Sequence, residues 1–128
     1  DGYRQILNFG HTVGHAIEAA SKLRLAHGAA VALGMLAEAD VGERMGITES
    51  GTCDRLGAVL ANLLPAGPLG VDHSEAMSYL ARDKKGRRDQ VRYVLLRRIG
   101  EVAPGDGWTH AVPGDLVSEA LGRVIDRF

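Results

Sequence analysis

The chain has 128 residues, of which 45% are hydrophobic and 24% charged, and its formal net charge is -1. This length suits one globular domain with a core of its own. The balanced charge lacks the electrostatic footprint that nucleic acids and membrane surfaces require, so neither is predicted as a partner. The single cysteine, Cys53, cannot form an internal disulfide; we expect a small helix residue in a reducing cytoplasm.

The start of the sequence has no methionine. The chain begins at Asp1, and a helical pattern already runs at residues 4–6. We therefore expect that the chain is a piece of a longer protein. Its longest apolar-rich window, residues 29–36, is too short to span a bilayer.

Two helices are predicted in the first third of the chain. Apolar residues recur every three or four positions over residues 4–22, which indicates a helix with one buried face. Gly10 and Gly14 fall inside it, so another helix or a ligand should approach the backbone there. Residues 28–45 are rich in alanine and apolar nearly all round, which is typical of a central, buried helix.

The rest of the chain predicts three more helices and a small β-element. A helix over 49–64 has Thr48 as its N-cap, a shorter one over 73–82 opens with a capping box at 72–75, and the last covers 113–127. Residues 91–96 predict a strand, with 99–103 as its hairpin partner. The predicted fold is mainly α, with about five helices and a small antiparallel β-element.

Three of the five histidines lie close together in the sequence. His11 and His15 are one helical turn apart, and His27 follows shortly after. A catalytic zinc normally has three ligands from His, Asp or Glu and one open position, and these histidines with Glu18 can supply two or three of them. The alternative is a polar helix interface in which hydrogen bonds satisfy the imidazoles.

Two further groups of polar residues can bind anions. Arg4 and Asn8 precede the histidines by helical steps, so the predicted helix face carries a cation, an amide and two imidazoles, which suits an anion site beside a metal. The run 83–88 is either solvated or a phosphate contact. His73 and His110 are isolated and predicted to be structural or exposed to solvent.

The histidine region closely resembles the C-terminal domain of 3-dehydroquinate synthases. The resemblance rests on Arg4-x-x-Leu7-Asn8-Phe9-Gly10-His11-Thr12-x-Gly14-His15-Ala16-x-Glu18, His27-Gly28-x-Ala30-Val31-x-x-Gly34-Met35, Asp83-Lys84-Lys85, 91–96 and Ile99-Gly100. It implies a lyase that converts 3-deoxy-D-arabino-heptulosonate 7-phosphate to 3-dehydroquinate and phosphate. This reaction belongs to the shikimate route of aromatic amino-acid biosynthesis, and the family uses NAD and a divalent metal, commonly zinc.

The resemblance also implies roles for individual residues. His11 and His27 match the two histidine metal ligands, and His15 matches a catalytic histidine suited to proton relay. Arg4 and Asn8 match substrate-binding positions. The segment with Lys84 and Lys85 matches one whose lysine reaches the anionic groups of the substrate, and both lysines remain candidates.

The chain departs from the family pattern in two respects. Ala29 stands where the family commonly has glutamate, which removes a carboxylate near the metal. The third metal ligand, a glutamate, and the NAD-binding loop belong to an N-terminal domain that we expect to be absent from this chain. That domain is then the partner of residues 1–128, and we expect these residues alone to be inactive.

Several alternatives stay open. Within the same fold they are another sugar phosphate cyclase, or a metal-dependent polyol dehydrogenase of the glycerol dehydrogenase type. A non-catalytic helical interaction domain is the alternative from a different class. A homodimer also remains open for the full-length enzyme.

Overall fold

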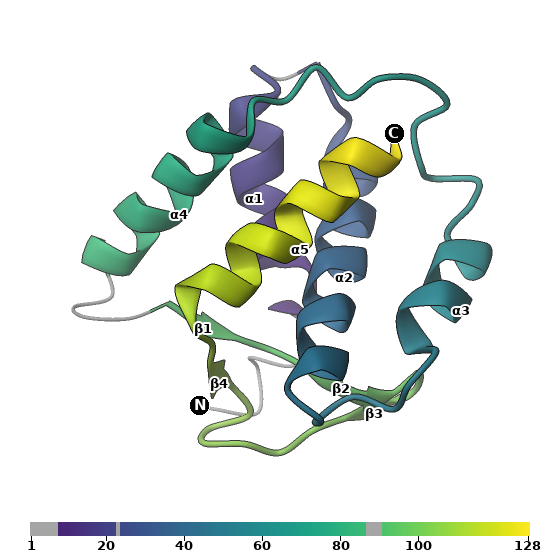
Figure 1. The fold of residues 1–128 in the computed structure, drawn as a ribbon, viewed down its shortest axis with the longest axis vertical. Coiled ribbons are helices and arrows are strands. Elements are labelled where there is room, and N and C mark those ends of the chain that lie inside the picture. The colour runs from purple at the N-terminus through teal and green to yellow at the C-terminus, as the bar shows by residue number, and fades with distance from the viewer. Residues whose placement is uncertain (1–7, 23, 87–90) are drawn as a thin grey trace.

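The computed structural model describes residues 8–22, 24–86 and 91–128, with the side chains of 83–86 left out. Within these residues there are five helices and four short strands (Figure 1). The helices are α1 (His11–Ala20), α2 (His27–Arg44), α3 (Thr52–Val59), α4 (His73–Gly86) and α5 (Gly114–Arg127). The strands are β1 (Arg92–Tyr93), β2 (Leu96–Arg98), β3 (Glu101–Val102) and β4 (His110–Ala111).

Helix α2 is the centre of the fold. It packs against α1, α3 and α5, while α4 covers the other side of α1 (Figure 1). Most of its residues are buried, including the alanines that let its neighbours approach closely. The prediction of a central, largely buried helix over 28–45 is confirmed to within one residue at each end.

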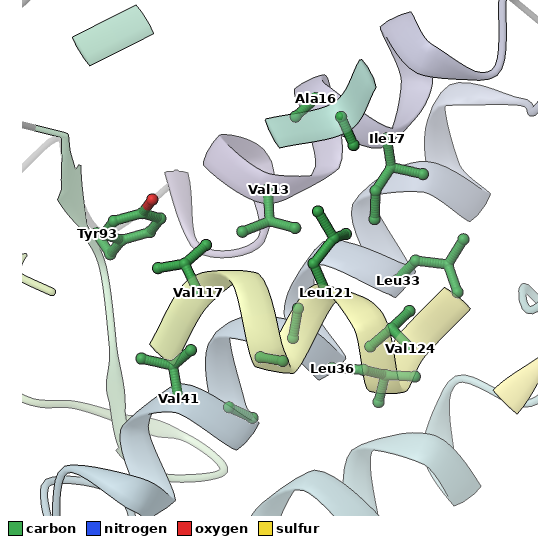
Figure 2. Close-up of a cluster of buried hydrophobic side chains, with 14 of the residues drawn as sticks. Val13, Ala16, Ile17, Leu33, Leu36, Val41, Tyr93, Val117, Leu121 and Val124 are labelled. Atoms are coloured by element: carbon green, nitrogen blue, oxygen red, sulfur yellow. The ribbon is translucent and has the colours of Figure 1, made fainter. Parts of the chain in front are cut away.

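The core forms where α1, α2 and α5 meet. Figure 2 shows Val13 and Ile17 of α1, Leu33 of α2, and Leu121 of α5 as members of one cluster of buried side chains. Ile17, Leu33 and Leu121 are each 0% exposed. Apolar residues at helical spacing in all three helices supply this core, and α5 begins one residue after the predicted position.

The prediction for the first helix was wrong at its start. Among the described residues α1 begins at His11, and Gly10, with a φ of 84°, is its N-cap outside the helix. Asn8 lies in a 3-10 helical stretch before it. Because a left-handed residue interrupts the helical path, Asn8 does not continue the helix face that carries His11 and His15. Arg4 lies outside the described residues.

The third helix is shorter than predicted and begins later. Its N-cap is Gly51, not Thr48. Thr48 is buried and its hydroxyl donates a hydrogen bond of 2.5 Å to the carbonyl of Leu96. This threonine therefore joins the end of α2 to β2, and it caps no helix.

The β-element consists of two small antiparallel pairs. Strand β2 pairs with β3 within the predicted second strand, but of the predicted first strand only Leu96 takes part. Strand β1 pairs instead with β4, which was not predicted. The single strand predicted over 91–96 is thus divided between two sheets. The fold class itself, mainly helical with small antiparallel sheets, is confirmed.

Candidate metal and substrate site

The three histidines predicted as a cluster come together in space. His11 and His15 lie on α1, and His27 is the first residue of α2. Their ring centres are 5.5 Å apart for His11 and His15, 5.7 Å for His11 and His27, and 6.0 Å for His15 and His27. Helix α1 packs against α2, and Glu18 of α1 lies within hydrogen-bond distance of His27 at the start of α2.

Hydrogen bonds orient two of the three rings. Nδ1 of His27 lies 2.9 Å from Oε1 of Glu18, and Nδ1 of His11 lies 3.3 Å from the carbonyl oxygen of Phe9. An imidazole whose Nδ1–H donates to a carboxylate or a carbonyl presents Nε2 as its free ligand atom, the arrangement common around protein-bound metals. Glu18 thus acts on His27 in this structure and is not itself a free ligand.

His11 and His27 fit a divalent metal as part of a coordination shell. Two imidazoles that share a metal at about 2.0–2.1 Å have ring centres roughly 5 Å apart, close to the 5.7 Å seen here. In the described part of the chain, no group of three or more His, Cys, Asp or Glu forms a ready metal site. These imidazoles therefore need at least one further ligand from elsewhere.

A cavity of about 320 Å³ opens beside the cluster. Side chains from the segment before α1, from α1 itself and from α4 line it: Asn8, His11, Thr12, His15, Ala16, Ala19, Tyr79 and Leu80. A second, more apolar hollow of about 280 Å³ is lined by both His11 and His27. His11 lines both spaces.

Tyr79 is a cavity residue that the sequence analysis missed. It lies on α4, and the guanidinium of Arg82 stacks over its ring at 4.6 Å. The signal available in the sequence was its place one helical turn before Asp83, so that one helix carries both Tyr79 and the predicted substrate lysines. Lys84 and Lys85 lie within α4, and their side chains are outside the described part.

Glycines allow α1 to lie against α2 at the site. A Cβ atom on Gly34 would lie 2.0 Å from the carbonyl oxygen of Gly10 and 2.5 Å from the amide nitrogen of Gly14. Both are backbone atoms, which cannot move aside as a flexible side chain can. The sequence predicted that a helix or a ligand approaches the backbone at Gly10 and Gly14. In the structure helix α2 does so.

Glu38 is a second residue that the sequence analysis missed. It is 1% exposed, and its two carboxyl oxygens accept hydrogen bonds from the amides of Gly10 at 2.9 Å and Val13 at 3.0 Å. Burial raises the pKa of this carboxyl from 4.5 to about 8, and the two amide hydrogen bonds oppose that rise. A buried carboxyl thus lies against the start of the helix that carries His11.

The remaining histidines have structural environments. Nε2 of His73 lies 2.8 Å from the carbonyl oxygen of Ser118, which ties α4 to α5, and Nε2 of His110 lies 3.3 Å from that of Ala103. Burial and nearby carboxylates raise the pKa of the Cys53 thiol to about 11, so it is protonated at neutral pH. These features agree with the structural roles predicted for all three residues.

Comparison with known proteins identifies the family. The model of the 3-dehydroquinate synthase C-terminal family matches residues 1–86. The 3-dehydroquinate synthase of Dehalococcoides mccartyi is 43% identical over 101 residues, which are 78% of this chain and 28% of that protein. That of a Synechococcus species is 38% identical over 128 residues, 98% of this chain and 34% of that protein.

A solved structure agrees with these relatives. A 2-deoxy-scyllo-inosose synthase, solved with carbaglucose-6-phosphate, NAD+ and Co2+, superposes with a TM-score of 0.82 at 28% identity, covering 91% of this chain and 32% of that one. The chain thus spans about a third of the length of the relatives that it matches. The chain belongs to the 3-dehydroquinate synthase family and corresponds to a C-terminal part of its members.

Proposed function

We propose that this chain is the metal- and substrate-binding part of an active 3-dehydroquinate synthase. The full-length protein, in this proposal, converts 3-deoxy-D-arabino-heptulosonate 7-phosphate to 3-dehydroquinate and phosphate. The observation that carries the proposal is the His11–His27 pair, with its Nδ1 atoms engaged, beside a cavity lined by Asn8 and His15. These features support the binding of a polyhydroxylated substrate at a metal.

In this proposal His11 and His27 hold a divalent metal, zinc by expectation, through Nε2. The metal would supply Lewis-acid polarisation of substrate oxygens, and NAD would accept and return a hydride. A structural relative solved with NAD+ and Co2+ supports this cofactor class.

The other site residues bind the substrate and move protons. His15 is exposed in the cavity, where its imidazole can take a proton from a substrate hydroxyl and return it. Asn8 can exchange hydrogen bonds with substrate oxygens, and Tyr79 closes the α4 side of the cavity. Arg4 and one of Lys84 and Lys85 are proposed to neutralise the anionic groups of the substrate.

The full-length protein is proposed to carry an N-terminal NAD-binding domain as well. That domain would supply the third metal ligand, a glutamate, and the second wall of the substrate cleft. The share of the relatives that this chain covers, about a third, supports a further domain. The 128 residues alone are therefore expected to release no phosphate. The cytoplasm is the proposed location, because Cys53 needs no oxidising compartment.

Membrane insertion has no structural support in the part of the chain that is described. None of its helices combines the length and the apolar character that crossing a bilayer requires.

Phosphate release by the full-length protein tests the proposal. With NAD, Zn2+ and the heptulosonate phosphate supplied, His11→Ala and His27→Ala should each abolish turnover and zinc binding. His110→Ala is the matched control, because His110 lies on β4 and lines neither hollow beside the cluster. Turnover and zinc content equal to the control in both variants would end the metal assignment.

The same preparation separates the alternatives. Another sugar phosphate cyclase would prefer a different heptulose or hexose phosphate in a substrate panel, and a polyol dehydrogenase would accumulate NADH. A non-catalytic interaction domain would show no turnover with any of these substrates.

A further inference from the structure

The carboxylate of Glu38 caps a helix that belongs to another part of the chain. Its Oε1 accepts from the amide of Gly10 and its Oε2 from the amide of Val13. These amides belong to the N-cap and first turn of α1, where helices have free N–H groups. Gly10 has no side chain that could cap them, so a carboxylate from α2 takes the place of a local N-cap residue.

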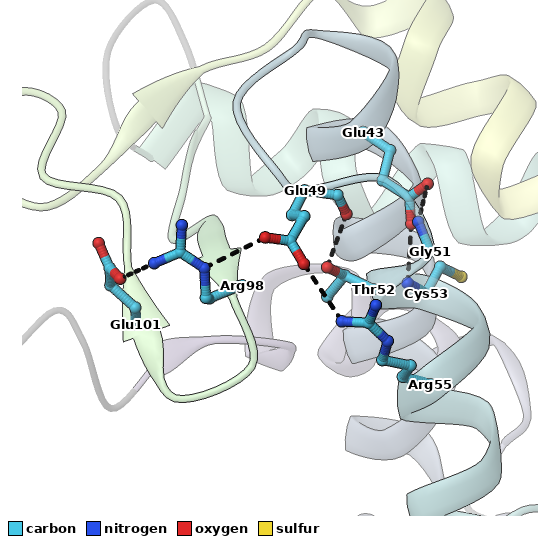
Figure 3. Close-up of polar contacts among 8 residues, drawn as sticks. All are labelled: Glu43, Glu49, Gly51, Thr52, Cys53, Arg55, Arg98 and Glu101. Atoms are coloured by element: carbon cyan, nitrogen blue, oxygen red, sulfur yellow. Dashed lines mark hydrogen bonds and ion pairs between the residues drawn. The ribbon is translucent and has the colours of Figure 1, made fainter.

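Helix α2 makes a second cap of the same kind. Glu43 accepts hydrogen bonds from the amides of Gly51 at 3.1 Å and Cys53 at 2.7 Å, at the start of α3 (Figure 3). Gly51, like Gly10, is a left-handed N-cap without a side chain. The two caps differ in what they hold, because α1 carries His11 in its first turn and α3 carries no histidine.

We propose that Glu38 is a positioning residue for the histidine site, which fixes the place of the His11 ring relative to His27. The two amides that it holds lie on either side of His11 in the sequence. Glu38 and His27 lie on the same helix, so the carboxylate links the helix of one imidazole directly to the start of the other. This inference rests on the proposed function only for the role of the two imidazoles as metal ligands.

Burial makes the loss of this contact hard to compensate. Glu38 is 1% exposed, so water cannot readily replace its oxygens at the two amides. In Glu38→Gln the volume is kept, but the side-chain NH2 group cannot accept from the backbone N–H that it faces, whereas a carboxyl oxygen can do so in either protonation state. The start of α1 should therefore shift or fray while the core of α1, α2 and α5 persists.

Side-chain NMR of the isotope-labelled 128-residue chain tests the proposal with Zn2+ as the probe. The nuclear Overhauser effect between the His11 and His27 ring protons reports their separation, and a Zn2+ titration reports their joint affinity. Glu38→Gln should weaken the first and raise the titration midpoint by about tenfold, within the range seen when groups that support metal ligands are removed. Glu43→Gln, which removes the matching cap from α3, should change neither readout.

The possible results separate this inference from the proposed function. A folded Glu38→Gln chain with the wild-type ring contact and midpoint would overturn the positioning role. No response of His11 and His27 to Zn2+ in the wild type would instead mean that the two imidazoles need the further ligand of the full-length protein before they bind zinc. The ring contact would still decide the positioning role, since it needs no metal. Backbone chemical shifts of α3 and α5 confirm that each variant is folded.

Discussion

The carboxylate of Glu18 lies 2.9 Å from Nδ1 of His27, nine residues further along the chain. The pair spans the turn from α1 to α2, and both side chains are partly exposed, at 24% for Glu18 and 58% for His27. At this exposure the hydrogen bond adds little to folding stability. Its consequence lies in the orientation of the His27 ring, which it fixes with Nε2 free.

Glu18→Ala is therefore expected to lower zinc affinity of the full-length protein about 10- to 100-fold with almost no loss of stability. A competition titration with a chelating dye measures the affinity, and thermal unfolding measures the stability. Glu119→Ala, at an exposed position of α5, is the control. Equal zinc affinity in the two variants would show that Glu18 does not orient a ligand.

Gly34→Ala should disrupt the contact between α1 and α2. The new Cβ would lie 2.0 Å from the Gly10 carbonyl oxygen, far inside any real contact distance, so the helices must separate. We expect a loss of about 3 kcal/mol in the free energy of unfolding, measured by urea denaturation.

Gly28→Ala is the matched control on the same helix. A Cβ at Gly28 would meet nothing within 4 Å. Alanine should then stabilise α2 by about 0.5–1 kcal/mol, because glycine loses more backbone freedom on folding. Similar stability of the two alanine variants would contradict the close approach at Gly34.

Much of the scaffold follows from apolar spacing. Helices α2 and α5 begin and end within one residue of their predicted bounds, because their buried faces are visible as runs of alanine, leucine and valine. The histidine cluster was predictable for a related reason. His11 and His15 share a face of a short helix, and the turn before His27 is too short to carry it away.

The parts that were missed depend on contacts between distant residues. In the sequence Glu38 is a polar residue within a mainly apolar helix, with nothing nearby that indicates its partners. The amides that it binds, those of Gly10 and Val13, are 28 and 25 residues away. The first helix was predicted to run from residue 4 because the apolar period continues over residues 4–9, whereas the positive φ of Gly10 interrupts the helical path and α1 begins at His11. Backbone amides and a glycine φ angle leave no trace in side-chain periodicity.

Cys53 is expected to react slowly with alkylating reagents. Burial, with contributions from Asp40 and Glu43, raises the pKa of its thiol to about 11, and its Sγ donates to the carbonyl of Leu36 at 3.3 Å. Only the thiolate is nucleophilic, and at pH 8 about 0.1% of such a thiol is ionised. Iodoacetamide should therefore modify native Cys53 at least 100-fold more slowly than the urea-unfolded chain. Equal rates in the two states would mean an accessible thiol of ordinary pKa.

Glu38 should make the chain less stable as the pH rises from about 4.5 to 8. Its pKa is 4.5 ordinarily and about 8 in the folded state, so over this range the unfolded carboxyl has lost a proton that the folded one keeps. Because the folded state binds more protons, its stability falls with rising pH, by up to about 1.4 kcal/mol per pH unit. The contribution is complete below pH 4.5 and lost above pH 8.

Urea denaturation across this range measures the effect, with Glu38→Gln as the reference. All other ionisable groups are present in both proteins, so their contributions cancel in the difference between the two profiles. The difference should slope between about pH 5 and 8 and become level above that range, since glutamine cannot ionise. Parallel profiles would mean that the Glu38 carboxyl keeps its ordinary pKa in the folded state. The amide hydrogen bonds at Gly10 and Val13 would then outweigh its burial.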